Sequence, residues 1–247
     1  MDVKLIIYYL CIILGTMLSA VCGYYIGIKK GMNKDTVKKY VAVAIISGIF
    51  GALLMGQLQN LIMSFTGLSF YPSRMRIFGG LFFTPFLMYF LVRYIAGDFL
   101  QVSDVIAPGA FLITGCSKIG CAVYGCCYGI PFGYGVKTQF EAHRVFPVQL
   151  LESVLCFILF AVMLYLVTKN KHRKGTAYPL SLILYGVMRF LVEFLRYCPE
   201  AEKEYFFGMS FWQPVSLAAV LTGAVWLTYR YLRCAPVNRS RKRQCEE

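Results

Sequence analysis

Long apolar runs separated by short polar and basic segments dominate the chain. A helix needs about 20 consecutive apolar residues to cross the hydrocarbon core of a membrane. Seven stretches approach that length: Leu5–Ile28, Tyr40–Leu68, Phe78–Ile95, Val105–Gly125, Phe146–Val167, Tyr178–Arg196 and Gln213–Leu232. The fourth is the weakest because Ser117, Lys118 and several glycines interrupt it, so it is either a full crossing or a re-entrant segment. The pattern predicts an all-α polytopic membrane protein with about seven transmembrane helices.

The basic residues of the loops predict how these helices are oriented. With seven spans, 16 Lys and Arg residues fall on one side of the membrane and 7 on the other. Loops rich in Lys and Arg stay in the cytoplasm, which places the N-terminus outside and the basic tail, residues 234–247, in the cytoplasm. Because the chain has no visible internal repeat, we expect residues 1–247 to form a single integral-membrane domain.

The composition excludes several other classes of protein. Apolar residues make up 58% of the chain and charged residues 15%, whereas a soluble domain carries about 25% charged residues. An ordinary soluble enzyme, a disordered chain and a disulfide-stapled secreted module are therefore excluded. The net charge of +13 lies in clusters between apolar runs. We interpret it as an orientation signal with attraction to anionic lipid, and not as a nucleic-acid-binding surface.

The cysteines and histidines show no familiar metal-binding spacing. None of the ten cysteines forms a CxxC pair, and neither His143 nor His172 lies at a zinc-finger distance from a cysteine pair. We therefore expect no metal and no organic cofactor. Most of the cysteines are expected to pack between helices as small apolar residues.

Four charged residues lie inside the predicted spans: Lys118, Glu152, Arg189 and Glu193. Each costs about 2.5–3.5 kcal/mol to insert at the centre of a membrane, and such groups usually serve function. Arg189 and Glu193 are four residues apart, so they lie on one helix face and can pair. Tyr185 lies on the same face, one turn earlier.

Two more polar residues extend these positions toward the outer side. Arg196 lies at the outer end of the helix face that carries Arg189. Gln149 lies three residues before Glu152. Cations at this depth suit a lipid phosphate, which Arg binds through two parallel hydrogen bonds. We interpret the group as a site for a phospholipid head group; the alternative is a structural ion pair that holds helices together.

A second unusual segment runs from Gly115 to Gly129 and combines regularly spaced glycines with four cysteines. The glycines favour either a tightly packed helix or exposed backbone in a re-entrant segment. The adjacent Cys126 and Cys127 could instead be reactive, because the nearby Lys118 would lower the pKa of a thiol.

The order of these features resembles the prolipoprotein diacylglyceryl transferase family. The similarity runs from about residue 70 to the C-terminus, while the first two spans match in hydropathy alone. The segments that carry it are Phe78–Leu81, Gln101–Pro108, the glycine-rich stretch through Gly129, Phe146–Glu152 and Tyr185–Arg196.

The resemblance implies an enzyme of the bacterial plasma membrane. It would move the diacylglyceryl group of phosphatidylglycerol onto the cysteine thiol of a prolipoprotein lipobox peptide and release glycerol phosphate. It also implies seven spans with an outside N-terminus. The matching catalytic positions are Arg189, Glu193, Tyr185 and Glu152. The matching lipid-binding positions are Lys118, Arg189, Gln149, Gly79, Gly80 and Gly129.

The chain differs from the family at positions that matter for chemistry. Phe78 and Phe146 stand where the family has His, and Lys118 stands where it has Arg. Cys121 and Cys126 replace its Asn and Glu. Because His is the natural base for a thiol, two alternatives stay open: a non-catalytic lipid-binding or partner protein on the same fold, and thiol chemistry through Cys126 and Cys127.

Overall fold

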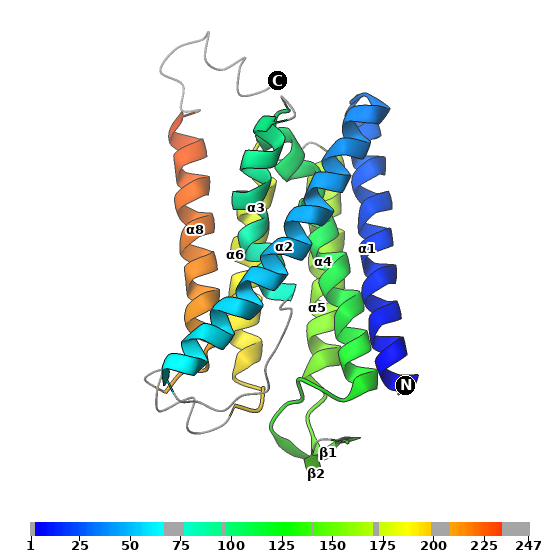
Figure 1. Ribbon diagram of the computed structural model, residues 1–247, viewed down its shortest axis with the longest axis vertical. Helices are drawn as coiled ribbons and strands as arrows, with labels where there is room; N and C mark the ends of the chain where they lie inside the picture. Colours follow the sequence, from blue (N-terminus) through cyan, green and yellow to red (C-terminus); the bar gives the residue numbers. More distant parts are fainter. Residues whose placement is uncertain are drawn as a thin grey trace.

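The computed structural model describes residues 3–66, 77–94, 97–139, 141–169, 173–198 and 208–233, apart from the side chains of residues 63, 77 and 78. The described residues form a bundle of long helices that run side by side (Figure 1). The helices are α1 (Val3–Lys29), α2 (Lys34–Thr66), α3 (Ile77–Tyr94), α4 (Phe99–Tyr124), α5 (Val148–Thr168), α6 (Ala177–Glu193) and α8 (Trp212–Arg233). The side chain of Phe78 and the basic tail 234–247 lie outside the described residues.

The prediction of a helical membrane protein is confirmed at the level of the architecture. Five helices are long and apolar enough to cross a membrane: α1, residues 34–62 of α2, α4, α5 and α8. Each of the seven predicted spans coincides with a helix of the bundle. The helix α6 has 17 residues, and at 1.5 Å per residue it is shorter than the hydrocarbon core is thick.

The bundle is all-helical as predicted, but the segment between α4 and α5 adds a β-hairpin that the sequence did not predict. Strand β1 (Pro131–Thr138) pairs antiparallel with β2 (Glu141–Val145). Phe132, Tyr134 and Val136 alternate with smaller or polar residues, the two-residue period of a strand. The hairpin lies at the end of the bundle that also holds the N-terminus (Figure 1). It also delays the start of α5 to Val148, two residues after the predicted Phe146.

The helix α4 is continuous over 26 residues and is long and apolar enough to cross a membrane, which favours a full crossing. It begins at Phe99, six residues before the predicted start, because Asp98 caps it: a carboxylate oxygen accepts hydrogen bonds from the backbone N–H groups of Leu100 and Gln101 at 3.0 and 3.3 Å. It ends at Gly125, whose φ of 87° is the left-handed conformation typical of a glycine at a helix C-terminus.

Small residues bring α1 and α4 into close contact. A Cβ placed on Gly15 would lie 2.8 Å from the Cβ of Cys116, and one placed on Gly120 would lie 3.1 Å from the Cβ of Cys11. Both distances leave little or no space for a larger side chain, as in other closely packed membrane helices. The interpretation of the glycine-rich stretch as a tightly packed helix is therefore confirmed within α4.

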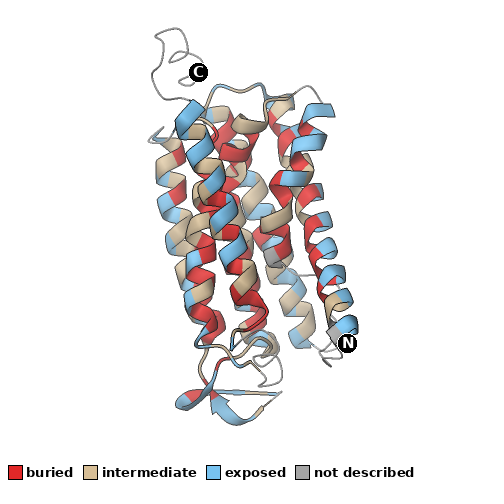
Figure 2. Ribbon diagram, turned by 90° about the vertical axis from the view of Figure 1, so that its left-hand side faces the viewer, coloured by how far each residue is buried: buried red, intermediate tan, exposed pale blue. Residues whose placement is uncertain are grey.

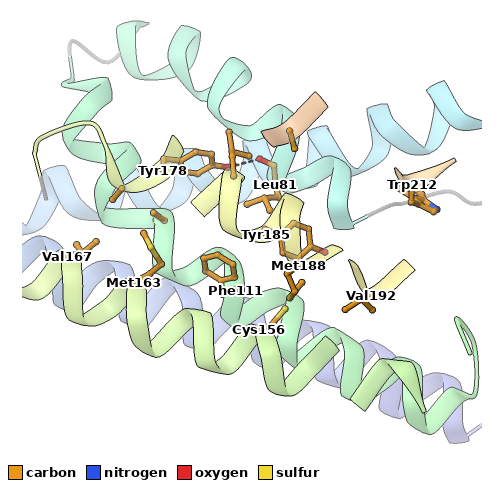
Figure 3. Close-up of a cluster of buried hydrophobic side chains, with 14 of the residues drawn as sticks. Leu81, Phe111, Cys156, Met163, Val167, Tyr178, Tyr185, Met188, Val192 and Trp212 are labelled. Atoms are coloured by element: carbon orange, nitrogen blue, oxygen red, sulfur yellow. Dashed lines mark hydrogen bonds between the residues drawn. The ribbon is translucent and has the colours of Figure 1, made fainter. Parts of the chain in front are cut away.

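The core lies between α4, α5 and α6, with Leu81 of α3 at its edge. Phe111, Cys156, Met163 and Tyr185 point into it from these three helices (Figure 3). The hydroxyl of Tyr178 donates a hydrogen bond of 2.8 Å to the carbonyl oxygen of Leu81, as drawn in Figure 3. Buried residues gather on the inner faces of the helices, and the outer faces are largely exposed (Figure 2).

Asp104 ties α4 to the start of α6. Its carboxylate accepts hydrogen bonds from the backbone N–H groups of Gly175 and Ala177 at 2.6 and 2.8 Å, and only 1% of the residue is exposed. A helix start has backbone N–H groups without partners in the helix, and a carboxylate there satisfies them and favours the helix dipole. We conclude that Asp104, which lies in one of the segments that carry the family resemblance, has a structural role.

Replacing Asp104 by alanine is expected to lower the free energy of unfolding by about 3 kcal/mol, because two buried N–H groups lose a charged acceptor. Unfolding of the purified protein in detergent would measure this. Asp35→Ala is a suitable control, since the side chain of Asp35 is 81% exposed. Equal effects of the two substitutions would contradict the role assigned to Asp104.

Candidate active site

Charged side chains from three helices meet inside the bundle. The Nζ atom of Lys118 on α4 lies 2.8 Å from Oε2 of Glu152 on α5. Nη1 of Arg189 on α6 lies 2.6 Å from Oε2 of Glu193, and its Nε lies 3.8 Å from Oε1 of Glu152. The predicted pairing of Arg189 with Glu193 is confirmed, and the four charged residues of the predicted spans form one connected group.

Residues just after α6 and around the start of α8 complete this group. Nη1 of Arg196 lies 3.9 Å from Oε2 of Glu193. The hydroxyl of Ser210 donates a hydrogen bond of 2.9 Å to Oε1 of Glu193, and the side-chain oxygen of Gln213 accepts one from the backbone N–H of Ser210. Sequence reasoning missed Ser210 and Gln213, because a serine before the last span and a glutamine at its first position carry no pattern of their own.

We call Lys118, Glu152, Arg189, Glu193 and Arg196 the ion cluster. It contains three cations and two carboxylates, which leaves one positive charge in excess. Glu152 is 1% exposed and Arg189 is 3% exposed, and a buried charge is costly unless a partner compensates it. The cluster is therefore suited to a ligand that brings one negative charge.

Three buried atoms of the cluster have no hydrogen-bond partner among the described residues. These are Nη1 of Arg189, Oε1 of Glu152 and Oε2 of Glu193. Nη1 of Arg189 is close to Glu193, but the angle is unsuitable for a hydrogen bond. Buried polar groups are normally satisfied, so an exception of this kind calls for a ligand, a water molecule or a functional role.

The loop after α4 connects the cluster to the hairpin end of the bundle. The side-chain amide of Gln149 donates a hydrogen bond of 2.6 Å to the carbonyl oxygen of Cys126. Gly129 forms a backbone bridge with Arg196. A Cβ on Gly129 would lie 2.6 Å from the carbonyl oxygen of Leu195, so this position requires glycine. Gln149 and Gly129, both predicted site residues, thus lie in the wall around the cluster.

The loop also alters the pKa values of two residues. Hydrogen bonds from Cys121 and Cys126 hold the pKa of the Cys127 thiol well below its ordinary value; burial opposes this, and the charges of Arg196 and Lys118 reinforce it. Burial lowers the pKa of Arg196, but Cys127 and the two carboxylates of the cluster outweigh it and raise that pKa. Arg196 is therefore charged at every physiological pH.

Three other predicted site residues lie outside the ion pairs. Tyr185 is 2% exposed and lies in the core, where its ring meets that of Phe111 edge to face (Figure 3). Gly79 and Gly80 lie in α3 against α2: a Cβ on Gly79 would overlap Met55, and one on Gly80 would lie 3.0 Å from the carbonyl oxygen of Gly48. These two glycines allow α2 and α3 to approach closely.

Gly80 also lines an apolar cavity of about 160 Å³ between α1, α2, α3 and α4. Thr84 and Ile113 contribute to its wall, together with Tyr178 of α6. A cavity of this size and polarity accepts an apolar group about as large as benzene.

Phe146, one of the two positions where the resemblance would place His, packs its ring against Phe132 of the hairpin at 5.7 Å between centroids. His143 lies on β2 and is exposed. Among the described residues, the ion cluster therefore contains no imidazole that could act as a base.

The fold and the site define a polytopic membrane protein with a buried polar site of net positive charge. A protein-family model described as prolipoprotein diacylglyceryl transferase matches residues 1–229. The chain belongs to the prolipoprotein diacylglyceryl transferase family, and it is a multi-pass protein of the bacterial plasma membrane.

Individual relatives agree with the family assignment. The chain is 28% identical over 205 residues to a phosphatidylglycerol–prolipoprotein diacylglyceryl transferase of Clostridium tetani, which covers 79% of this chain and 81% of the relative. It is 29% identical to a second enzyme of that name from Clostridium perfringens, over 70% of this chain and 72% of the relative. A relative from Streptococcus uberis is 26% identical over 90% of both chains.

Proposed function

We propose that this protein transfers the diacylglyceryl group of phosphatidylglycerol to the cysteine thiol of a prolipoprotein lipobox peptide and releases glycerol phosphate. Family membership supports the reaction, since the relatives carry the name of this transferase. The single observation that carries the proposal is the excess positive charge of the buried ion cluster. A phosphodiester head group has one negative charge and accepts hydrogen bonds, so it supplies what the cluster lacks.

The residues of the cluster take distinct roles in this proposal. Lys118 and Arg189 bind the phosphate and stabilise the charge that develops on the departing glycerol phosphate. Glu193 holds Arg189 in position, and Glu152 orients Lys118 and assists proton transfer. Arg196 adds a third positive charge.

The remaining predicted residues hold the lipid around that centre. Gln149 and Gly129 shape the wall near the head group, and Tyr185 supports Arg189 from one turn away on α6. The apolar cavity beside Gly80 accommodates part of an acyl chain, while Gly79 preserves the contact of α3 with α2.

The proposed topology has seven spans in a single domain, 1–247, with the N-terminus outside and the tail 234–247 in the cytoplasm. The hairpin shares one end of the bundle with the N-terminus while α8 ends at the other (Figure 1), as an odd number of spans requires. The ion cluster then lies in the half of the bundle nearer the outer side, where lipobox peptides are presented.

Expression in cells depleted of their own transferase tests the function. A lipobox reporter is expected to gain the mass of one diacylglyceryl group when this chain is present and to stay unmodified with an empty vector. A reporter whose lipobox Cys is replaced by Ser should also stay unmodified. If the protein reaches the membrane and the reporter keeps its original mass, the proposed transfer is wrong.

One observation favours an alternative, a lipid-binding protein without turnover. Residue 146 is a phenylalanine packed on Phe132, so there is no imidazole base at the position where the resemblance would place His. In that case, phosphatidylglycerol would co-purify with the protein while the reporter stayed unmodified.

A further inference from the structure

Three cysteines converge beside the ion cluster, and we call them the cysteine triad: Cys121, Cys126 and Cys127. Their Sγ atoms all lie within 4.8 Å of one another. In the part of the chain that the structure describes, this is the one group of three or more metal-ligand side chains gathered so closely. Cys121 comes from the last turn of α4, and the other two come from the loop that follows.

The backbone of this loop explains how neighbouring cysteines can point to one place. Successive side chains of an extended chain point in opposite directions. Here the helix ends in a left-handed Gly125, and Cys127 itself has a φ of 59°. A non-glycine residue in that region is uncommon and costs conformational energy, and such strain gathers at functional sites.

We infer that the cysteine triad binds a zinc ion through three thiolates and leaves its fourth position to the thiol of the acceptor peptide. Thiolates prefer zinc among the common divalent ions. A tetrahedral zinc site with Zn–S bonds of about 2.3 Å spaces its sulfurs about 3.8 Å apart. The triad reaches this spacing with shifts of about 1 Å or less. Zinc sites with three protein ligands and an open position are the catalytic kind.

The position of the triad matches the proposed reaction, on which the role of the fourth ligand rests. Cys121 lies three residues after Lys118, nearly one turn along α4, and Gln149 links the carbonyl oxygen of Cys126 to the helix of Glu152. Lys118 and Arg196 are close enough to act electrostatically on Cys127. The bound phosphate and the acceptor thiol would therefore lie at the same end of the bundle.

The triad also leaves room for an outside ligand. Cys126 and Cys127 are only partly buried, whereas Cys121 is buried. A fourth ligand can therefore approach from the loop side, at the end of the bundle that carries the hairpin.

Zinc would replace the imidazole base that the ion cluster does not contain. A thiol that binds zinc loses its proton, and that proton goes to solvent. The bound sulfur then donates an electron pair to the glyceryl carbon, a C–S bond forms, and the C–O bond to the phosphate breaks. The electron pair of that bond leaves with glycerol phosphate, which becomes a dianion beside Lys118 and Arg189. The charges balance: a thiol and a phosphodiester anion give a thioether, a phosphate dianion and one proton.

Cobalt(II), a spectroscopic substitute for zinc, tests the site without turnover. The full chain, carrying Cys234→Ser and Cys245→Ser to remove the tail thiols, is purified in detergent and titrated with cobalt. We expect the sulfur-to-cobalt and visible bands of a tetrahedral thiolate site at about one ion per chain. Cys121→Ser, Cys126→Ser and Cys127→Ser should each weaken binding at least about 100-fold. Cys22→Ser in α1 should leave it unchanged.

A lipobox peptide tests the fourth position. Adding the peptide to the cobalt-loaded protein should raise the sulfur-to-cobalt absorbance by about one third, because a fourth thiolate joins three. The same peptide with Ser in place of Cys should have no such effect. The inference is overturned if cobalt gives no tetrahedral spectrum, if the bands survive the triad substitutions, if the two peptides behave alike, or if two of the triad cysteines form a disulfide in freshly purified, active protein.

The reporter assay separates this inference from the proposed function. If Cys127→Ser modifies the reporter as fast as the parent does, the transferase function stands and the zinc inference fails. If the cobalt and peptide signals are present while the parent never modifies the reporter, the metal site stands and the proposed transfer fails.

Discussion

Replacing Arg189 by alanine is expected to reduce the rate of reporter modification by about 1,000-fold. Arg189 lies between the two buried carboxylates, 2.6 Å from Glu193 and 3.8 Å from Glu152. Its removal leaves the ion cluster with no excess positive charge to receive a phosphate. It also removes a donor aimed at charge that develops during the reaction, and the loss of one such donor costs about 100- to 1,000-fold. Mass spectrometry of the reporter over time measures the rate.

Two further variants separate charge stabilisation from folding. Arg189→Lys keeps the charge but loses the two parallel donors, so its rate should lie between those of the parent and the alanine variant. Arg189→Met combined with Glu193→Leu removes a buried ion pair while keeping volume, which proteins often tolerate. If that double variant folds and still modifies the reporter at the parental rate, Arg189 does not bind the phosphate. The exposed Arg93→Ala serves as the control that should stay active.

Replacing Glu152 by leucine is expected to lower the free energy of unfolding by about 3–5 kcal/mol. Glu152 is 1% exposed, and it is the carboxylate that Lys118 and Arg189 share. Without it, two buried cations face each other and the excess positive charge of the cluster doubles. Unfolding in detergent, monitored by circular dichroism, measures the loss.

A double-mutant cycle shows whether the loss belongs to the ion pair. Glu152→Leu combined with Lys118→Met should recover most of the lost stability, because it removes an unpaired cation along with its partner. The exposed pair of Asp35 and Lys38, 3.7 Å apart, is the matched comparison and should show a coupling below about 1 kcal/mol. Equal coupling energies for the two pairs would show that burial does not govern the interaction.

Much of the helical framework could be predicted from the sequence, because a run of apolar residues long enough to cross a membrane has few other stable conformations. The predicted ends of the spans differ from the observed ends of the helices by a few residues. The largest differences, six residues each, are at the starts of α2 and α4. The start of α4 depends on Asp98 as a cap, a local interaction that hydropathy does not register. The hairpin was missed because its two strands are too short to be found by the length of an apolar run, although Phe132, Tyr134 and Val136 show the two-residue period of a strand.

The ion cluster was predicted in part. Arg189 and Glu193 are one helix turn apart, so their pairing follows from helix geometry alone. The contacts of Glu152 with Lys118 and Arg189 join three helices that are distant in sequence. A charged residue in an apolar run shows that a partner must exist, but it does not show which residue that partner is.

The cysteine triad could not be predicted at all. Four residues separate Cys121 from Cys126, and the adjacent Cys126 and Cys127 match no familiar ligand spacing. The triad forms because α4 ends at a left-handed Gly125 and Cys127 adopts a positive φ. A backbone path of this kind depends on what the loop packs against.

The sequence by itself determined the class of protein, the positions of its helices and the presence of buried charge, since these follow from the cost of placing polar groups in hydrocarbon and from the period of a helix. The tertiary structure decided which charges meet, that one positive charge is in excess, and that three thiols lie together beside it. These features depend on how α4, α5 and α6 pack, and packing is set by close contacts between residues far apart along the chain.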